Sequence, residues 1–260
     1  DEGTAFRFKS SINFSNLLSL NVEYKKEDAD FHRLEERLGT GDTHEYMSLQ
    51  TTFNSDMFLP SNWGIKMPFN INLSSSIKTP KYYPTQPDVL TESDSSNIVP
   101  DSIKTINNTI SFSSSFNKTT KSDNWLLRST IDKLSLNYSI IDKNNSSVEI
   151  GSDEISNSDF SIGYSYTFNK NNYITPFKIF ENIPLIGDPV SNTKIYYSPE
   201  KFSTNMSVSE SEQNKIMRTG VTTNTYDLNM SRSYILNHKF TETLKSNYKK
   251  NISSDLDFFM

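Results

Sequence analysis

Hydrophobic and polar residues alternate almost without interruption in the middle of the segment Phe58–Val89. Because successive side chains of a β-strand point to opposite faces, the segment predicts a strand with one apolar and one polar face. The alternating part exceeds the roughly 5–6 residues of a usual soluble strand and reaches the about 9–11 residues that cross a bilayer. The apolar positions are Ile65, Met67, Phe69, Ile71, Leu73 and Ile77.

Aromatic residues lie at both ends of this segment, with Trp63 before the alternating part and Tyr82 and Tyr83 after it. These are the positions that interface aromatics occupy in a membrane β-barrel. Alternation alone also fits a soluble β-sandwich, but the length of the strand and its aromatic ends favour the barrel.

The same alternation recurs along the chain. It predicts an all-β fold with about ten long strands in an antiparallel up-and-down arrangement, as in a transmembrane β-barrel. The expected strands are residues 5–13, 17–26, 43–54, 64–78, 105–119, 131–142, 158–169, 201–211, 219–239 and 243–251.

The connections are expected to alternate between short turns at one end and longer loops at the other, as in outer-membrane barrels. Residues 27–42 and 79–104 form the long loops, and the second contains Pro80, Pro84 and Pro87, which lack the N–H that a central ladder needs. The alternation fails at about 170–197. Because consecutive strands run alternately up and down, the connection at 170–197 is expected at the short-turn end, as irregular or locally paired structure.

Two residues interrupt the strand pattern. Pro68 falls inside its strand and predicts a bulge or a late start of regular pairing. Arg232 falls on the apolar face of the penultimate strand by strict counting, where a charge at mid-depth of a bilayer costs about 2–4 kcal/mol. A bulge that turns Arg232 to the polar face is the preferred interpretation.

Composition narrows the class of function. Hydrophobic residues make up only 34% of the chain while aromatic residues reach 12%, which suits strands with apolar residues at alternate positions. A net charge of -5 argues against nucleic acid as a partner, and the chain has no cysteine. The histidines (His32, His44 and His238) are scattered, and no catalytic, cofactor or metal-binding motif is present. We therefore expect no enzyme, no cofactor and no metal site.

Several stretches together resemble one protein family. They are the run from Phe31 to Leu38, LPSNWGIKMPFNINLSSSIKTPKYYPTQPDV at 59–89, SDFSIGYSYTF at 158–168, TPFKIFENIPLI at 175–186, KIYYSPEKFSTNMSVSE at 194–210 and TYDLNMSRSYILNHKFTETLKSNYKK at 225–250. In this order they resemble the SprA family, the very large outer-membrane translocons of the bacterial type IX secretion system, also called gliding-motility or cell-surface proteins.

The resemblance implies that residues 1–260 form one contiguous wall segment, a transmembrane β-barrel sector that is part of a much larger barrel in the bacterial outer membrane. That barrel is a channel that passes folded secreted proteins to the cell surface. The resemblance also implies as partners the remainder of the barrel, an accessory outer-membrane barrel, a plug protein, the cargo proteins and the lipid membrane. The long loops at 27–42 and 79–104 would then lie at the extracellular side.

A wide barrel needs a hydrated lumen, so the polar face is expected to line it and the apolar face to contact lipid. The residues expected to face the lumen are Lys66, Asn70, Asn72, Ser74, Ser113, Ser161 and Ser165. Those expected to face lipid are Ile65, Phe69, Ile71, Phe112, Tyr164 and Leu236. Two alternatives remain open, an ordinary outer-membrane porin or uptake barrel and a secreted β-rich adhesin-like surface protein.

Overall fold

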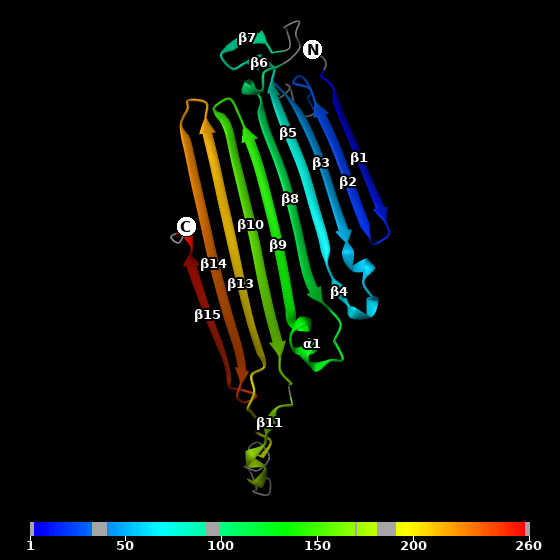
Figure 1. Cartoon of the computed structure of the whole chain (residues 1–260), viewed down its shortest axis with the longest axis vertical. Helices are drawn as coiled ribbons and strands as arrows, with labels where there is room; N and C mark the ends of the chain where they lie inside the picture. The colour runs from blue at the N-terminus through cyan, green and yellow to red at the C-terminus, as the bar shows by residue number, and fades with distance from the viewer. Residues whose placement is uncertain (1–2, 33–40, 92–98, 170, 181–190, 258–260) are drawn as a thin grey trace.

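The computed structural model describes residues 3–32, 41–91, 99–169, 171–180 and 191–257. In these residues the chain forms one large antiparallel sheet whose long strands lie side by side in sequence order (Figure 1). The long strands are β1 (Ala5–Phe14), β2 (Leu18–Glu27), β3 (Asp42–Asn54), β5 (Pro68–Pro80), β8 (Thr105–Lys118), β9 (Leu134–Ser146), β10 (Ile150–Thr167), β13 (Lys201–Met217), β14 (Thr222–Lys239) and β15 (Lys245–Asp255).

All ten predicted strands are present, and every sequential neighbour pair is antiparallel. The strand expected at 64–78 is divided at Met67 into the short β4 (Ile65–Lys66), which pairs with β8, and β5, which begins at Pro68. Pairing of β5 with β3 also begins at Pro68. The predicted late start of regular pairing at this proline is confirmed.

Two strands are much longer than their alternation predicts. β10 begins at Ile150 rather than 158, and β13 continues to Met217 rather than 211. The added halves carry polar residues on both faces, so the two-residue hydrophobic period that identifies a strand from sequence is absent there. Their side chains pair instead by hydrogen bonds, as from Ser156 Oγ to Asp142 Oδ1 at 2.6 Å.

The connections do not divide into short turns at one end and long loops at the other. We call the end of the sheet beside β6 (Tyr82–Tyr83) and β7 (Gln86–Leu90) the upper end, and the end beside α1 (Trp125–Ser129) the lower end (Figure 1). The upper end carries the predicted loops but also the tight turn at 218–221. The lower end carries the short turn at 15–17 and the long connection between β10 and β13.

The long lower connection extends well beyond the sheet (Figure 1) and contains β11 (Tyr173–Ile174) paired with β12 (Ile195–Tyr196). This pair lies within the segment 170–197 that was expected to be irregular or locally paired, of which residues 170 and 181–190 lie outside the described residues. In the segment expected as a loop at 79–104, β6 and β7 form a small hairpin. Residues 33–40 and 92–98 of the predicted long loops also lie outside the described residues.

The sheet is open, and in the described parts of the chain no second sheet or layer of long helices covers either face. β1 and β15 are the two ends of the strand order and do not pair with each other. Among the described residues Ala29 is the one buried hydrophobic residue, and no large side chain is fully buried. Soluble antiparallel sheets cover their apolar face with another layer. This sheet instead presents its apolar side chains to the surroundings, with Phe14 58% and Ile110 54% exposed.

Candidate functional site: the two faces of the sheet

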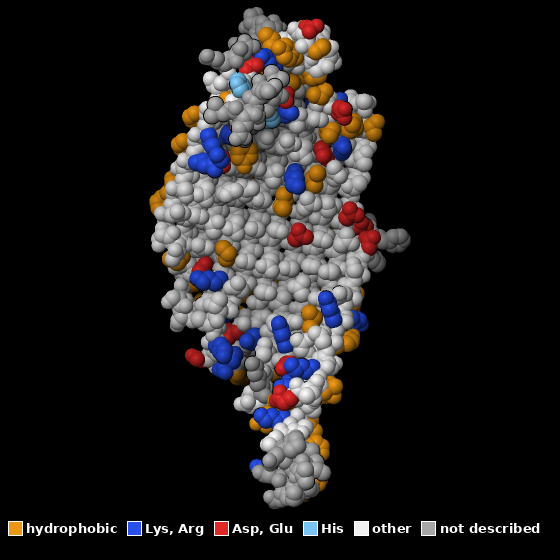
Figure 2. Space-filling view, turned by 180° about the vertical axis from the view of Figure 1, so that it is seen from behind, with side chains coloured by type: hydrophobic (Ala, Val, Ile, Leu, Met, Phe, Trp, Pro, Cys, Tyr) orange, Lys and Arg blue, Asp and Glu red, His pale blue; other side chains and the backbone are white. Residues whose placement is uncertain are grey.

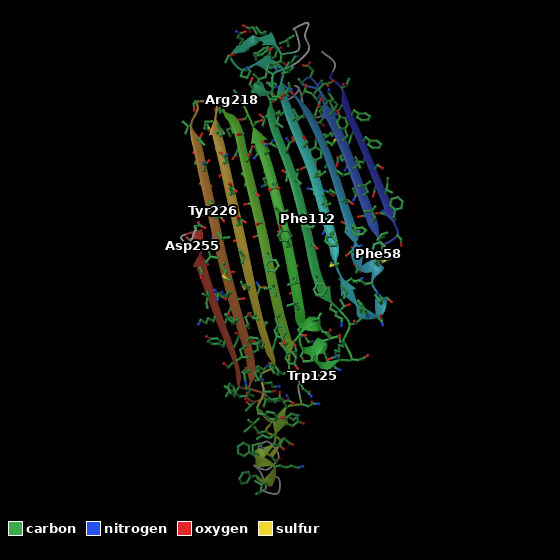
Figure 3. All side chains as sticks on the ribbon, viewed as in Figure 1. Phe58, Phe112, Trp125, Arg218, Tyr226 and Asp255 are labelled. Atoms are coloured by element: carbon green, nitrogen blue, oxygen red, sulfur yellow. The ribbon has the colours of Figure 1, made fainter. Side chains whose placement is uncertain are left out.

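Most apolar side chains of the ten strands share one face. In an antiparallel ladder directly paired residues point to the same side, and the register joins Ile71 to Phe112 and Phe202 to Leu236. The residues expected to face lipid, Ile65, Phe69, Ile71, Phe112, Tyr164 and Leu236, all lie on this apolar face. Figure 3 shows Phe112 near the middle of the sheet and Phe58 and Trp125 near the lower end.

A ladder of aromatic rings crosses the apolar face from β3 to β9. Phe53 and Phe69 have ring centroids 6.4 Å apart, Phe69 and Phe112 are 6.1 Å apart, and Phe112 and Tyr138 are 6.2 Å apart. All three pairs are tilted, an arrangement that aromatic rings prefer over a face-to-face sandwich. Neighbouring strands are thus held together on this face by side-chain contacts as well as by the backbone.

The opposite face is polar and carries every residue expected to line a lumen. The register pairs Asn70 with Ser113 and Ser161 with Asn137, and the expected residues Lys66, Asn70, Asn72, Ser74, Ser113, Ser161 and Ser165 all lie there. Hydrogen bonds link them across strands, from Asn70 Nδ2 to Ser113 Oγ at 3.4 Å and from Asn137 Nδ2 to Ser161 Oγ at 3.2 Å. Figure 2 shows this face, where few hydrophobic side chains interrupt the uncharged polar surface over the middle of the sheet.

The expected interface aromatics lie at opposite ends of β5. Trp63 belongs to the 3-10 turn Ser61–Trp63 at the lower end, and Tyr82 and Tyr83 form β6 above the upper end. They lie outside the large sheet rather than at its strand ends.

The apolar band runs diagonally across the hydrogen-bonded rows of the sheet. On β1 the band covers Phe6 to Phe14 and is centred on Ser10. Following directly paired residues from strand to strand defines a row perpendicular to the strands, and the row that starts at Ser10 reaches β10 at Ser156. On β10 the band covers Phe160 to Tyr166, with its centre seven residues from Ser156. Seven residues span about 23 Å, and the six strand spacings between β1 and β10 span about 29 Å. The band is therefore inclined to the rows by about 40°.

Arg232 lies on the apolar face. The register of β14 with β13 and with β15 is uninterrupted there and pairs Arg232 with Met206 and Ile252. The predicted bulge is therefore wrong. The guanidinium Nη2 of Arg232 donates to Met230 Sδ at 3.4 Å, so the side chain extends along the strand toward the upper border of the band, where Glu210 lies on β13. A long cationic side chain relieves its position in an apolar band in this way.

If the apolar face contacts lipid, replacing Arg232 by leucine is expected to stabilise the protein in vesicles slightly, by up to about 1 kcal/mol, since a charge near the border of a bilayer is only weakly unfavourable. Urea-induced unfolding from vesicles, followed by tryptophan fluorescence, measures the change. Ser231→Leu is the matched control on the polar face, where it removes the Ser207–Ser231 hydrogen bond of 2.7 Å. A loss of stability in Arg232→Leu would instead mean that the guanidinium has an essential partner.

At the lower end the connection from β8 to β9 folds back over the apolar face. The Tyr164 hydroxyl of β10 donates to the backbone carbonyl of Ser129 at 2.7 Å, which fixes α1 against this face. Asn124 caps α1 by accepting the Leu126 N–H at 2.9 Å. The exposed side chains of α1 include Trp125, which is 70% exposed.

A buried ion pair holds this connection to the end of β8. Lys118 Nζ lies 2.6 Å from Asp132 Oδ1, with side chains 9% and 3% exposed. Burial acts to raise the pKa of Asp132, but the hydrogen bonds from Lys118 and from the backbone N–H and hydroxyl of Ser122 outweigh it and lower the pKa to about 2. The carboxylate is therefore ionised throughout the physiological range.

Acidification is expected to loosen the lower connection between about pH 4 and pH 2. The pKa of Asp132 is about 2 in the folded protein and about 3.9 in an unfolded chain, so its stabilisation is complete above about pH 4 and is lost as the pH falls through 2. Fluorescence of Trp63 and Trp125 follows the change. Asp132→Asn should lack this transition, and a variant that keeps it would assign the transition to another carboxylate.

Sequence reasoning missed α1 because residues 120–130 were read only as a gap between two strands. It missed the Lys118–Asp132 pair because both residues were assigned to the predicted strands 105–119 and 131–142, whereas Asp132 lies in the 3-10 turn Ile131–Lys133 that precedes β9. The run Trp125, Leu126 and Leu127 directly after Asn124 is the signal that identifies the short helix and its cap. None of the helices in the described ranges is both long and apolar enough to span a membrane. No group of three or more His, Cys, Asp or Glu side chains suited to a metal ion occurs in the same ranges.

The fold and its faces define a mostly antiparallel β protein with one large, open, two-faced sheet. Residues 2–94 match the family SprA_N, described as motility related/secretion protein. The match covers the strands from β1 to β7, confirms the resemblance to SprA, and relates this chain to motility- and secretion-related proteins. No curated protein matches the chain.

Proposed function

We propose that the sheet is a sector of the wall of a protein-conducting channel in the bacterial outer membrane, through which folded secreted proteins pass to the cell surface. The observation that carries the proposal is the uncovered apolar band and its inclination of about 40° to the strand rows, since strands of outer-membrane barrels cross the bilayer tilted by about 35–45°. The rows are perpendicular to the strands, so an apolar band that lies in the plane of a bilayer is inclined to the rows by the same angle as the strands are tilted from the bilayer normal.

In this proposal lipid contacts the apolar face and the polar face lines a hydrated lumen. Hydroxyl and amide groups dominate the polar face and are already paired with one another across strands, as between Asn70 and Ser113. Polar groups that are paired with one another have fewer free donors and acceptors with which to hold a passing cargo protein. The similarity to motility related/secretion proteins over residues 2–94 supports transport of proteins rather than of small solutes.

The edges of the sheet fit a sector rather than a complete pore. β1 and β15 leave their outer edges unpaired with each other, and further strands of the same barrel would pair there. The accessory barrel, the plug and the cargo belong to the proposal as partners, and the upper loops at 27–42 and 79–104 as its extracellular side. A porin closed within the described sheet is not supported, because that sheet is open.

Site-specific photocrosslinking in living cells tests the proposal. A photoreactive amino acid at Ser113 faces the proposed lumen, and the same amino acid at Phe112 faces lipid. Adducts with proteins that otherwise accumulate outside the cell are expected from position 113 and not from position 112. Equal adducts from both positions, or none from 113, would contradict the channel. Release of the protein by alkaline carbonate would instead favour a secreted adhesin-like protein.

A further inference from the structure

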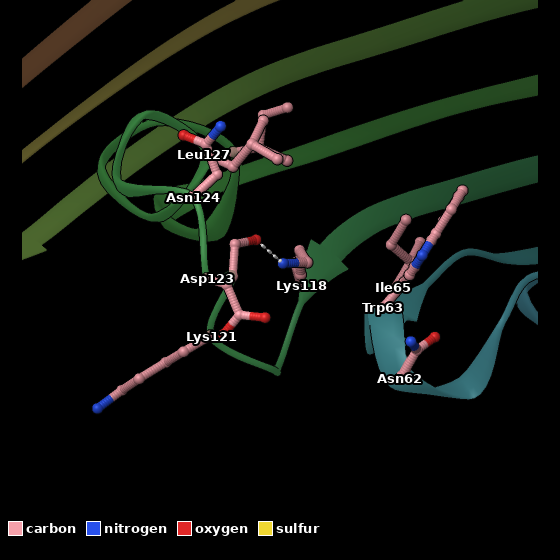
Figure 4. A pocket seen from close by; sticks show the side chains of 10 residues that line it. Asn62, Trp63, Ile65, Lys118, Lys121, Asp123, Asn124 and Leu127 are labelled. Carbon is pink, nitrogen blue, oxygen red and sulfur yellow. Dashed lines mark hydrogen bonds between the residues drawn. The ribbon is translucent and has the colours of Figure 1, made fainter.

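A cavity of about 470 Å³ lies at the lower end of the sheet, between the segment that precedes β5 and the connection from β8 to β9 (Figure 4). Asn62, Trp63 and Ile65 form one wall, and residues of the loop at 121–124 together with Leu127 form the other. Its volume falls in the range of about 300–1,000 Å³ that small-molecule sites occupy.

The cavity adjoins the apolar band. Ile65 of the cavity wall pairs with Lys118 and therefore points to the apolar face of the sheet. On the other side of the cavity, Tyr164 of the same face donates to the carbonyl of Ser129 beside α1. The cavity thus lies on the lipid side of the proposed wall, at the lower border of the band. A molecule that fills it would contact the apolar face and the surrounding water at once.

Its lining is apolar on one part and charged on another. Trp63, Ile65 and Leu127 supply the apolar part, while Lys121 and Asp123 place a cation and an anion two residues apart on one loop. The third charged lining residue, Lys118, is engaged by Asp132. Figure 4 shows Lys121 extending outward from its loop, away from Trp63.

The loop that carries these two charges is held in place by α1. The guanidinium of Arg128 donates from Nε to the carbonyl of Ser122 and from Nη2 to the carbonyl of Asp123, both at 3.1 Å. The Ser122 backbone N–H is bound in turn by Asp132. The backbone of the loop at Ser122 and Asp123 is therefore held by the fold and not by a ligand.

We propose that this cavity binds the headgroup of phosphatidylethanolamine. The lipid phosphate accepts from the Lys121 ammonium, the ethanolamine ammonium donates to the Asp123 carboxylate, and the acyl chains leave over Trp63 and Ile65 toward the apolar band. Phosphatidylglycerol has no ammonium and brings its phosphate close to Asp123, and the choline ammonium has no N–H to donate. The inference rests on the proposed membrane location.

The chain offers a direct probe, because Trp63 and Trp125 are its two tryptophans. Trp125→Phe leaves Trp63, which lines the cavity, as the one fluorophore, and Trp63→Phe leaves the exposed Trp125 as a matched reporter of bulk lipid. Each protein is reconstituted in phosphatidylcholine vesicles with the same small mole fraction of acyl-brominated phosphatidylethanolamine, phosphatidylglycerol or phosphatidylcholine. Bromine quenches tryptophan only in close proximity.

Brominated phosphatidylethanolamine is expected to quench Trp63 as strongly as if its concentration beside Trp63 were about five times that in the vesicle as a whole. Two weak ion pairs account for an enrichment of this size. Trp125 should be quenched equally by all three lipids. Lys121→Ala should abolish the enrichment at Trp63, and Asp123→Asn should remove the discrimination against phosphatidylglycerol.

Equal quenching of Trp63 by the three lipids would overturn the headgroup site and leave the membrane location standing. Stronger quenching by phosphatidylglycerol would overturn the assignment of Asp123 to an ammonium. If no brominated lipid quenched either tryptophan, the membrane location itself would fail, and the lipid site with it.

Discussion

In the proposed membrane wall, an arginine in place of Ile162 is expected to destabilise the protein by about 2–4 kcal/mol, the effect of a charge at bilayer mid-depth on the lipid face of a barrel. Ile162 lies in the middle of the apolar band on β10 and pairs with Leu136 and Met206 on the neighbouring strands. An arginine side chain at position 162 could not reach either border of the apolar band, whereas Arg232 lies near the upper border. Urea-induced unfolding from vesicles measures the loss.

Ser161→Arg is the matched control, one residue away on the polar face. It removes one hydrogen bond, from Asn137, and places its guanidinium in the proposed lumen. We expect a change of less than about 1 kcal/mol for this variant. The reverse order, with Ser161→Arg the more damaging of the two, would mean that the faces are assigned the wrong way round.

Alanine in place of Gly64 is expected to destabilise the lower end of the sheet by about 2–4 kcal/mol, from backbone strain together with a steric clash. Gly64 has φ +60°, and a Cβ there would lie 2.7 Å from the backbone N of Thr120. Its carbonyl also accepts the Thr119 N–H at 2.8 Å. Thermal unfolding and Trp63 fluorescence measure the loss of this junction.

Gly220→Ala separates the two contributions. Gly220 has φ +87° in the upper turn, and a Cβ there would meet nothing within 4 Å, so this variant reports backbone strain alone. It is expected to destabilise by about 1–2 kcal/mol. Equal effects of the two substitutions would show that the contact between Gly64 and Thr120 does not hold the lower end together.

The sheet could be predicted wherever one face is apolar. The half of β10 from Phe160 to Tyr166 has a strict two-residue period, while its half from Ile150 to Ser158 is polar on both faces and has none. Strand pairing in that half is fixed by the backbone ladder and by contacts with β9, across a short turn, and with β13, which lies far away in the sequence. No local pattern contains that information.

The two faces of the sheet could be predicted because the two-residue period of each strand agrees with the register between strands. Counting residues along one strand therefore assigns each residue, and its paired residues on the neighbouring strands, to the apolar or the polar face. Arg232 is the exception. A bulge was predicted because the sequence does not show how far a residue lies from the border of the apolar band. The alignment of the strands shows that the band is diagonal and that Arg232 lies near its upper border. The cavity at the lower end joins Trp63 to Leu127 through tertiary contacts and left no trace in the hydrophobic pattern.

The central claim is that the apolar band of this sheet lies in a bilayer with the strands tilted. Since the chain has no cysteine, single cysteines carrying a nitroxide can be placed along β1 and along β10 without background labelling. Collision rates with oxygen, which concentrates in lipid, and with a water-soluble nickel complex report the surroundings of each label. The account predicts a two-residue alternation of oxygen access centred on Ser10 in β1 and on Gly163 in β10, and no alternation from Asp153 to Ser158. Equal access on both faces, or a band centred on Ser156 in β10, would contradict it.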